Sequence, residues 1–109
     1  MHTKIILLLL SCVFAAPICA SDFHEIYIEI KENKFIPSQV HAPANVKIKI
    51  VVENKDDSVE EFESSDLNRE KIIPPGKKVN IVLPPLKEGR YEFMGEFHPE
   101  TTKGFLIIE

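Results

Sequence analysis

The sequence predicts an all-β protein, a Greek-key β-sandwich of about seven to eight strands. Three observations support this fold class. Apolar and polar residues alternate with a period of two along most of the chain after residue 20. Pro, Gly and Asn separate the alternating runs at intervals typical of sandwich turns. Eight prolines in 109 residues leave little room for helices, because proline breaks a helix interior.

Four runs have the alternation that places one face of a strand on a core and the other toward water. They span 26–30, 46–52, 79–83 and 91–93. A fifth run, 105–108, is apolar on both faces and predicts a more buried strand. The only candidate helix is a short turn over 67–71, capped by Ser65 or Asp66.

The first twenty residues predict a secretory signal peptide, which leaves 21–109 as a single domain. Lys4 precedes an apolar run from Ile5 to Leu10, and Ala20 ends the segment before the polar Ser21. The run is shorter than the ~20 apolar residues that span a bilayer. We therefore favour a signal peptide over a membrane anchor, and expect no membrane span after cleavage. A lipidated Cys12 is the weaker alternative.

Cleavage after Ala20 would also remove both cysteines, Cys12 and Cys19. The remaining domain would contain no disulfide and no thiolate ligand. Loss of Lys4 changes the formal net charge from −4 to −5, and no basic patch is present in the sequence. We therefore expect no nucleic-acid partner.

Two segments, 54–69 and 94–104, do not follow a simple strand pattern. Binding residues concentrate on loops held by a rigid scaffold, so function is sought in these two segments. The first segment is rich in acids, and the second contains His98 between Glu96 and Pro99. A run of acids is ordinarily a solvated surface, and a cation site is the alternative.

The order of several short motifs resembles the cupredoxin family. The motifs are Phe35-Ile36-Pro37, the run 46–52 ending at Asn54, Pro75-Gly76, residues 89–93, and Gly104 with 105–108. The resemblance covers nearly all of 21–109. It implies a cupredoxin-like sandwich with metal ligands on the loop after Asn54 and on the loop after Phe93.

Blue copper members of that family bind the metal through a His, a Cys, a second His three residues later and a Met. By this resemblance His98 stands at the second-His position, and Gly95 stands where the Cys would be. The first-His position falls on Glu60 or Glu61. A type 1 copper site needs a thiolate in its His₂Cys plane, so we expect a site that is not type 1 blue copper.

Three stretches, 61–64, 67–71 and 95–99, resemble cupredoxin-like domains that accompany bacterial iron-uptake systems. This resemblance implies a periplasmic protein that binds an iron or copper ion. The implied partner is an inner-membrane iron permease or another periplasmic uptake component. A ferroxidase-type redox protein and a metal-free β-sandwich interaction module are the alternatives, so enzymatic activity stays open.

His98 is a candidate ligand because a neutral imidazole binds copper, iron and zinc. Glu61 and Glu63 share one face of an extended segment, whereas Glu60 shares the face of Phe62. We predict a thiolate-free site of Glu61, Glu63, Glu96 and His98, with Glu60 and Met94 as alternates. Oxygen donors favour iron or Cu²⁺ over Cu⁺. Flexible carboxylates that must be ordered predict weak binding.

Overall fold

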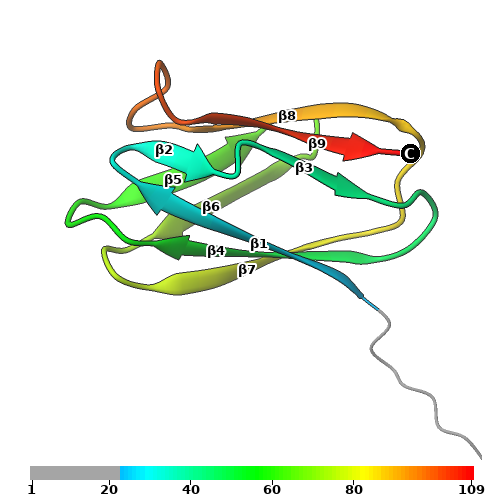
Figure 1. Ribbon diagram of the computed structural model, residues 1–109, viewed down its shortest axis with the longest axis horizontal. Coiled ribbons are helices and arrows are strands. Elements are labelled where there is room, and N and C mark those ends of the chain that lie inside the picture. The colour runs from blue at the N-terminus through cyan, green and yellow to red at the C-terminus, as the bar shows by residue number, and fades with distance from the viewer. Residues whose placement is uncertain (1–22) are drawn as a thin grey trace, which may run out of the picture.

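The computed structural model describes residues 23–109 and folds them into nine strands (Figure 1). The predicted signal peptide and both cysteines lie outside the described residues. In chain order the strands are β1 (His24–Lys31), β2 (Lys34–Ile36), β3 (Gln39–Ala42), β4 (Ile48–Asn54), β5 (Glu60–Ser64), β6 (Arg69–Ile73), β7 (Lys78–Leu83), β8 (Gly89–Gly95) and β9 (Lys103–Ile108).

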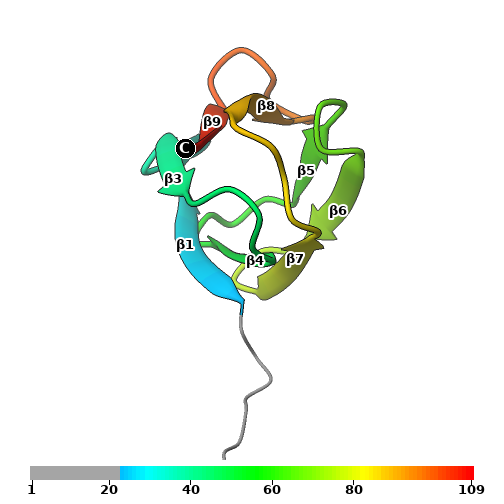
Figure 2. The same ribbon diagram turned by 90° about the vertical axis from the view of Figure 1, so that its right-hand side faces the viewer.

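The strands form two sheets, with the orders β2-β1-β4-β7 and β3-β9-β8-β5-β6. β1 pairs in parallel with β4, and β3 pairs in parallel with β9, whereas the other pairs are antiparallel. Viewed end-on, the two sheets face each other as a flattened barrel (Figure 2). The predicted all-β sandwich is confirmed. The strand count exceeds the predicted seven to eight, because the short β2 and β3 on either side of Pro37-Ser38 carry little periodic signal.

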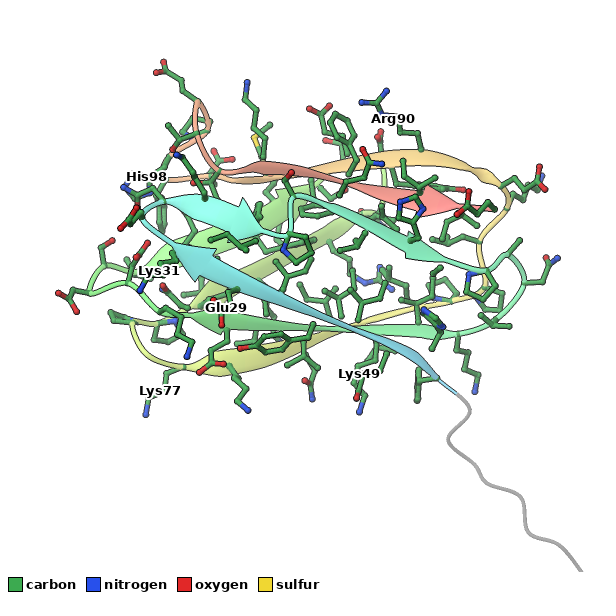
Figure 3. The ribbon with its side chains drawn as sticks, viewed as in Figure 1. Glu29, Lys31, Lys49, Lys77, Arg90 and His98 are labelled. Carbon is green, nitrogen blue, oxygen red and sulfur yellow. The ribbon has the colours of Figure 1, made fainter. Side chains whose placement is uncertain are left out.

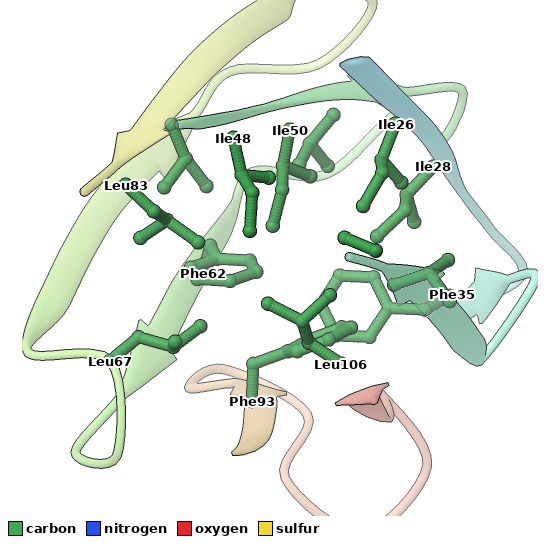
Figure 4. Close-up of a cluster of buried hydrophobic side chains, with 14 of the residues drawn as sticks. Ile26, Ile28, Phe35, Ile48, Ile50, Phe62, Leu67, Leu83, Phe93 and Leu106 are labelled. Carbon is green, nitrogen blue, oxygen red and sulfur yellow. The ribbon is translucent and has the colours of Figure 1, made fainter. Parts of the chain in front are cut away.

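The core is made by the inward residues of both sheets. Ile48, Ile50 and Val52 of β4 are fully buried, as the period-two pattern predicts. Ile48 and Ile50 face Phe62 and Leu106 from the other sheet (Figure 4). The alternating runs of the sequence are therefore strands, as predicted, and their apolar faces pack against each other between the two sheets.

Three phenylalanines from different strands form an aromatic cluster in this core. The ring of Phe93 lies 5.0 Å from that of Phe62 in a stacked arrangement and 5.0 Å from that of Phe35 edge to face. Such pairs stabilise a core beyond the apolar area that they bury. The cluster joins β2, β5 and β8; β5 lies within the segment 54–69, and β8 leads into the segment 94–104.

The candidate helix over 67–71 was wrong. Residues 65–68 form a turn, and β6 begins at Arg69. The Oγ of Ser64, rather than Ser65, accepts the N–H of Leu67 at 3.0 Å, and the buried Leu67 fixes the turn to the core. Asp66 instead accepts the N–H of Glu92 at 2.9 Å. Within 23–109 no helix is long and apolar enough to cross a membrane.

We expect Phe93→Ala to lower the free energy of unfolding by about 3–5 kcal/mol, because it removes a buried ring and leaves a cavity beside Phe35 and Phe62. Urea unfolding followed by circular dichroism measures the loss. The matched control is Phe97→Ala, since the Phe97 side chain is 47% exposed and its loss should change stability by less than about 0.5 kcal/mol. Equal losses in the two variants would contradict this account of the core.

Candidate functional site

One end of the sandwich collects the connections β1–β2, β4–β5, β6–β7 and β8–β9 (left in Figure 1). Asp56 of the β4–β5 loop accepts the N–H groups of Glu32 at 2.7 Å and Asn33 at 2.9 Å. Thr102, which is fully buried, donates its hydroxyl to the carbonyl of Asn33 at 2.6 Å. The first part of the segment 54–69, up to Glu60, and the segment 94–104 therefore lie at the same end and are tied through the β1–β2 turn, whereas the turn 65–68 lies at the other end of β5.

Asn54 fixes the path of the chain from β4 into β5. Its side chain is fully buried and donates to the carbonyls of Ser58 at 2.8 Å and Ile73 at 3.0 Å. Its Oδ1 accepts the N–H of Asp56 at 2.9 Å. A buried amide with all these partners satisfied holds one conformation of the loop. The position of Glu60, the first residue of β5, follows from that conformation.

Glu60 and His98 form the polar centre of this end. The Glu60 side chain is 2% exposed, and its Oε2 lies 2.7 Å from Nδ1 of His98, whose side chain is 33% exposed. The other carboxylate oxygen, Oε1, accepts the N–H groups of Glu61 and Phe97, both at 2.9 Å. Figure 3 shows His98 at the end of the sandwich that also carries Lys31 and Lys77. A buried carboxylate with three hydrogen-bond partners is held in one orientation.

The backbone of the β8–β9 loop is closed on itself and on β5. His98 donates its N–H to the carbonyl of Gly95 at 3.1 Å, and Thr102 donates to the carbonyl of His98 at 2.9 Å. Gly95 donates to the carbonyl of Thr102 at 2.7 Å, and Glu96 donates to that of Glu61 at 2.8 Å. The loop thus holds the His98 imidazole in place through its own hydrogen bonds.

The structure divides the six candidate ligands between two faces of one sheet. Glu60 points inward with Phe62, and it meets His98. Glu61 and Glu63 lie on the outer face, because successive side chains of a strand alternate. Met94 is opposite Glu63 in the β5–β8 register, also on the outer face, and Glu96 follows in the loop. The alternate Glu60, not Glu61 or Glu63, is the carboxylate beside His98.

Among residues 23–109 no three His, Asp or Glu side chains converge as a ready metal cage. The group named from the sequence is therefore not assembled as one cluster. Sequence reasoning also missed Thr102 and Asp56, which tie the loops together. In the sequence, Thr102 is marked only as a polar residue at the end of a loop, shortly before the apolar strand 105–108.

Comparison with known proteins decides the family. A family model described as a cupredoxin-like domain matches residues 4–108. The chain belongs to the cupredoxin-like domain family. An uncharacterized protein of Rickettsia prowazekii (strain Madrid E) is 50% identical over 84 residues, which are 77% of this chain and 67% of that protein.

Solved cupredoxin-like structures share the fold at low sequence identity. The metal-binding domain of the Cu(I)-exporting P-type ATPase of Streptococcus pneumoniae D39, solved with Cu(I), has a TM-score of 0.73 at 16% identity, covering 84% of this chain and 90% of that one. A purple cupredoxin from Nitrosopumilus maritimus has a TM-score of 0.61 at 18% identity, covering 77% and 99%. An apo copper-binding protein has a TM-score of 0.72 at 20% identity, covering 84% and 92%.

The thiolate copper centre of a blue cupredoxin does not fit the described residues. Residues 23–109 contain no cysteine, and Gly95 carries no side chain at the position that the resemblance assigns to the thiolate. The space beside Gly95 is filled, since a Cβ there would lie 2.7 Å from Cδ of Glu60. The Glu60 carboxylate and the His98 imidazole are the two donors that meet beside Gly95.

The outer acids have an electrostatic consequence of their own. Partial burial and the neighbouring Glu96 carboxylate raise the pKa of Glu63, and the charges of Glu70 and Glu61 add to the shift. These carboxylates repel each other when ionised. The raised pKa means that the folded state takes up the Glu63 proton at a higher pH than the unfolded chain does.

We expect Glu63→Gln to stabilise the protein near neutral pH and to give no gain in acid. A group whose folded pKa is raised favours folding at low pH, and that contribution is lost as the pH rises through the folded pKa. Gln removes the charge at every pH, so the melting temperature should rise at about pH 7 and be unchanged below about pH 4. Thermal unfolding across this range measures it. Glu88→Gln, an exposed change in the β7–β8 connection, serves as the control.

Proposed function

We propose that this cupredoxin-like protein binds an iron or copper ion at a thiolate-free site centred on Glu60 and His98. One observation carries the proposal: Oε2 of Glu60 and Nδ1 of His98 lie 2.7 Å apart. Two ligand atoms at right angles, each about 2.0–2.1 Å from a metal ion, are separated by about 2.9 Å. The distance between the two atoms is therefore compatible with one metal ion at adjacent coordination positions, once the imidazole turns so that Nδ1 points at the ion instead of at Oε2.

In the metal-free pair one proton lies between Nδ1 and Oε2, and Nδ1 must give it up before it can bind a metal ion. From a neutral ring that proton moves to Nε2 of the same imidazole, and from an imidazolium one proton is released to solvent. The bonds from the N–H groups of Glu61 and Phe97 to Oε1 stay in place, and they orient the carboxylate as outer partners orient metal ligands. Glu60 is therefore an ordered donor, unlike the flexible carboxylates expected from the sequence.

Two protein donors leave the other coordination positions to water or to a donor from a partner. Binding of this kind is reversible, which suits a protein that receives an ion and passes it on. A carboxylate oxygen and an imidazole favour iron or Cu²⁺, whereas Cu⁺ prefers sulfur ligands. The copper-binding proteins among the structural neighbours support a metal ion as the ligand. The site differs from type 1 blue copper by lacking the thiolate.

The biological setting is proposed from the sequence alone. The signal-peptide pattern of residues 1–20 supports export to the periplasm. The resemblance of 61–64, 67–71 and 95–99 to iron-uptake domains supports a role beside an inner-membrane iron permease or another uptake component. On this proposal the protein is an accessory that binds the ion rather than an enzyme.

A metal-free interaction module is the second candidate, and one observation favours it. The Glu60 carboxylate already has three hydrogen-bond partners, so it is satisfied without a metal ion. In that case the Glu60–His98 pair would serve to hold the β8–β9 loop, and the function would lie on the surface of the sandwich.

Calorimetric titration of the protein with Cu²⁺, Fe²⁺ and chelated Fe³⁺ tests the metal site. We expect Glu60→Gln and His98→Ala each to weaken binding by roughly tenfold or more. Glu61→Gln should leave the affinity unchanged, because its side chain lies on the outer face. Affinity should fall as the pH is lowered, because protons compete with the metal ion. Oxygen consumption on Fe²⁺ addition would identify a ferroxidase instead of a carrier.

No binding by the wild type, or equal binding by all three variants, would overturn the site and favour the metal-free module. Circular dichroism of each variant without metal shows whether a lost affinity reflects a lost fold.

Expression of the full chain in a Gram-negative host tests export. We expect the protein in the periplasmic fraction with an N-terminus at or near Ser21, because Ala20 ends the predicted signal peptide. Mass spectrometry of the purified protein reads the terminus directly. An intact Met1 in a membrane fraction, or an acyl chain on Cys12, would contradict the prediction.

A further inference from the structure

Gly95 has no space for a side chain, and the Glu60 carboxylate is one of the groups that fill that space. A Cβ on residue 95 would lie 2.7 Å from Cδ of Glu60 and 2.7 Å from both Cβ and Cγ2 of Thr102. These separations are shorter than real Cβ atoms adopt, so one of the neighbours would have to move. Gly95 ends strand β8 and is not among the residues with positive φ. The requirement for glycine here is steric and not conformational.

Neither neighbour can move away without cost. Glu60 is 2% exposed and is held by the N–H groups of Glu61 and Phe97 and by Nδ1 of His98. Thr102 is fully buried, and its hydroxyl donates to the carbonyl of Asn33. Displacing either side chain would leave buried polar groups without partners, which is expensive.

We propose that Gly95 determines the donor set of the site: by leaving its side-chain space to Glu60, it supplies a carboxylate beside His98 and excludes any donor carried by residue 95, a thiolate included. The steric part of this inference stands on the packing alone. Its metal part rests on the proposed function of Glu60 and His98.

The inference changes what a substitution at residue 95 can do. A cysteine added there would collide with Glu60 instead of joining His98 as a ligand. A soft site for Cu⁺ would therefore need at least two changes, a thiol at residue 95 and a shorter side chain at residue 60, and Thr102 would also have to shift. The preference for an oxygen donor is thus set by a pair of residues and not by the absence of cysteine alone.

The steric part is tested by thermal unfolding without metal. We expect Gly95→Ala to lower the melting temperature by roughly 5–15 °C, as overpacking of a small domain does. In Glu60→Ala/Gly95→Ala the fall should be smaller than the sum of the two single falls, because truncation of Glu60 frees part of the space. The Thr102 contact remains, so the relief is partial. Glu61→Ala/Gly95→Ala is the matched control. Its melting temperature should be lowered by the sum of the changes that the two single variants show.

Two results would overturn the inference. One is a lowering of the melting temperature that is additive in both double variants, and the other is a Gly95→Ala protein as stable as the wild type. A further outcome is that Gly95→Ala alone does not fold. In that case the inference is supported if Glu60→Ala/Gly95→Ala folds and Glu61→Ala/Gly95→Ala does not. Failure of both double variants to fold counts against it, because relief by Glu60 truncation is the result that it requires.

The metal part is tested by competition with a chromophoric Cu⁺ chelator under reducing conditions. Glu60→Ala/Gly95→Cys should bind Cu⁺ more tightly than Gly95→Cys alone and the wild type, by roughly tenfold or more. Equal Cu⁺ affinity of Gly95→Cys and the double variant would show that Glu60 does not exclude the thiolate. A wild type that binds no metal, together with non-additive melting temperatures, would refute the proposed function and leave the steric inference intact.

Discussion

The arrangement of the β8–β9 loop depends on one buried carboxylate. Glu60 stands at the start of β5, and its two oxygens engage the backbone of Glu61 and Phe97 and the imidazole of His98. Burying a carboxylate is costly unless charge or hydrogen bonds compensate, so this group enforces the loop geometry that satisfies it. These contacts fix the β8–β9 loop to the sheet in one conformation.

The packing around Glu60 positions it for these contacts with the β8–β9 loop. Beneath Glu60 the rings of Phe62, Phe93 and Phe35 fill the core between the sheets. Above it, Asn54 sets the approach of the chain to β5, and Thr102 connects the far side of the loop to Asn33. Apolar packing therefore supplies the stability, while a small set of satisfied polar groups selects one geometry at the end of the sandwich.

The sequence was sufficient for the fold and only partly sufficient for the site. Period-two runs such as 46–52 predict strands because burial of one face dictates the pattern, whereas β2 and β3 are too short to show it. Within the site, His98 and the two loop segments could be selected from the sequence. The carboxylate that lies beside His98 could not be selected, because the choice between Glu60 and Glu61 depends on a register of one residue, which exchanges the faces of a strand. The role of Gly95 is a tertiary contact with a residue 35 positions away, and no local pattern reports it.

The proposed metal site has two protein donors, and it would have to remain stable without its ion. In a centre built from a thiolate and imidazoles, the metal ion compensates for the cost of bringing the donors together. Here the hydrogen bond between Glu60 and His98 compensates for the cost of bringing the two groups together. The absence of a side chain on Gly95 leaves the space that the Glu60 carboxylate occupies. The same arrangement makes any bound ion compete with a hydrogen bond that is already satisfied. If the proposed function holds, the loop keeps one shape whether or not an ion is present, and the ion is released at less cost than from a cage that collapses when emptied.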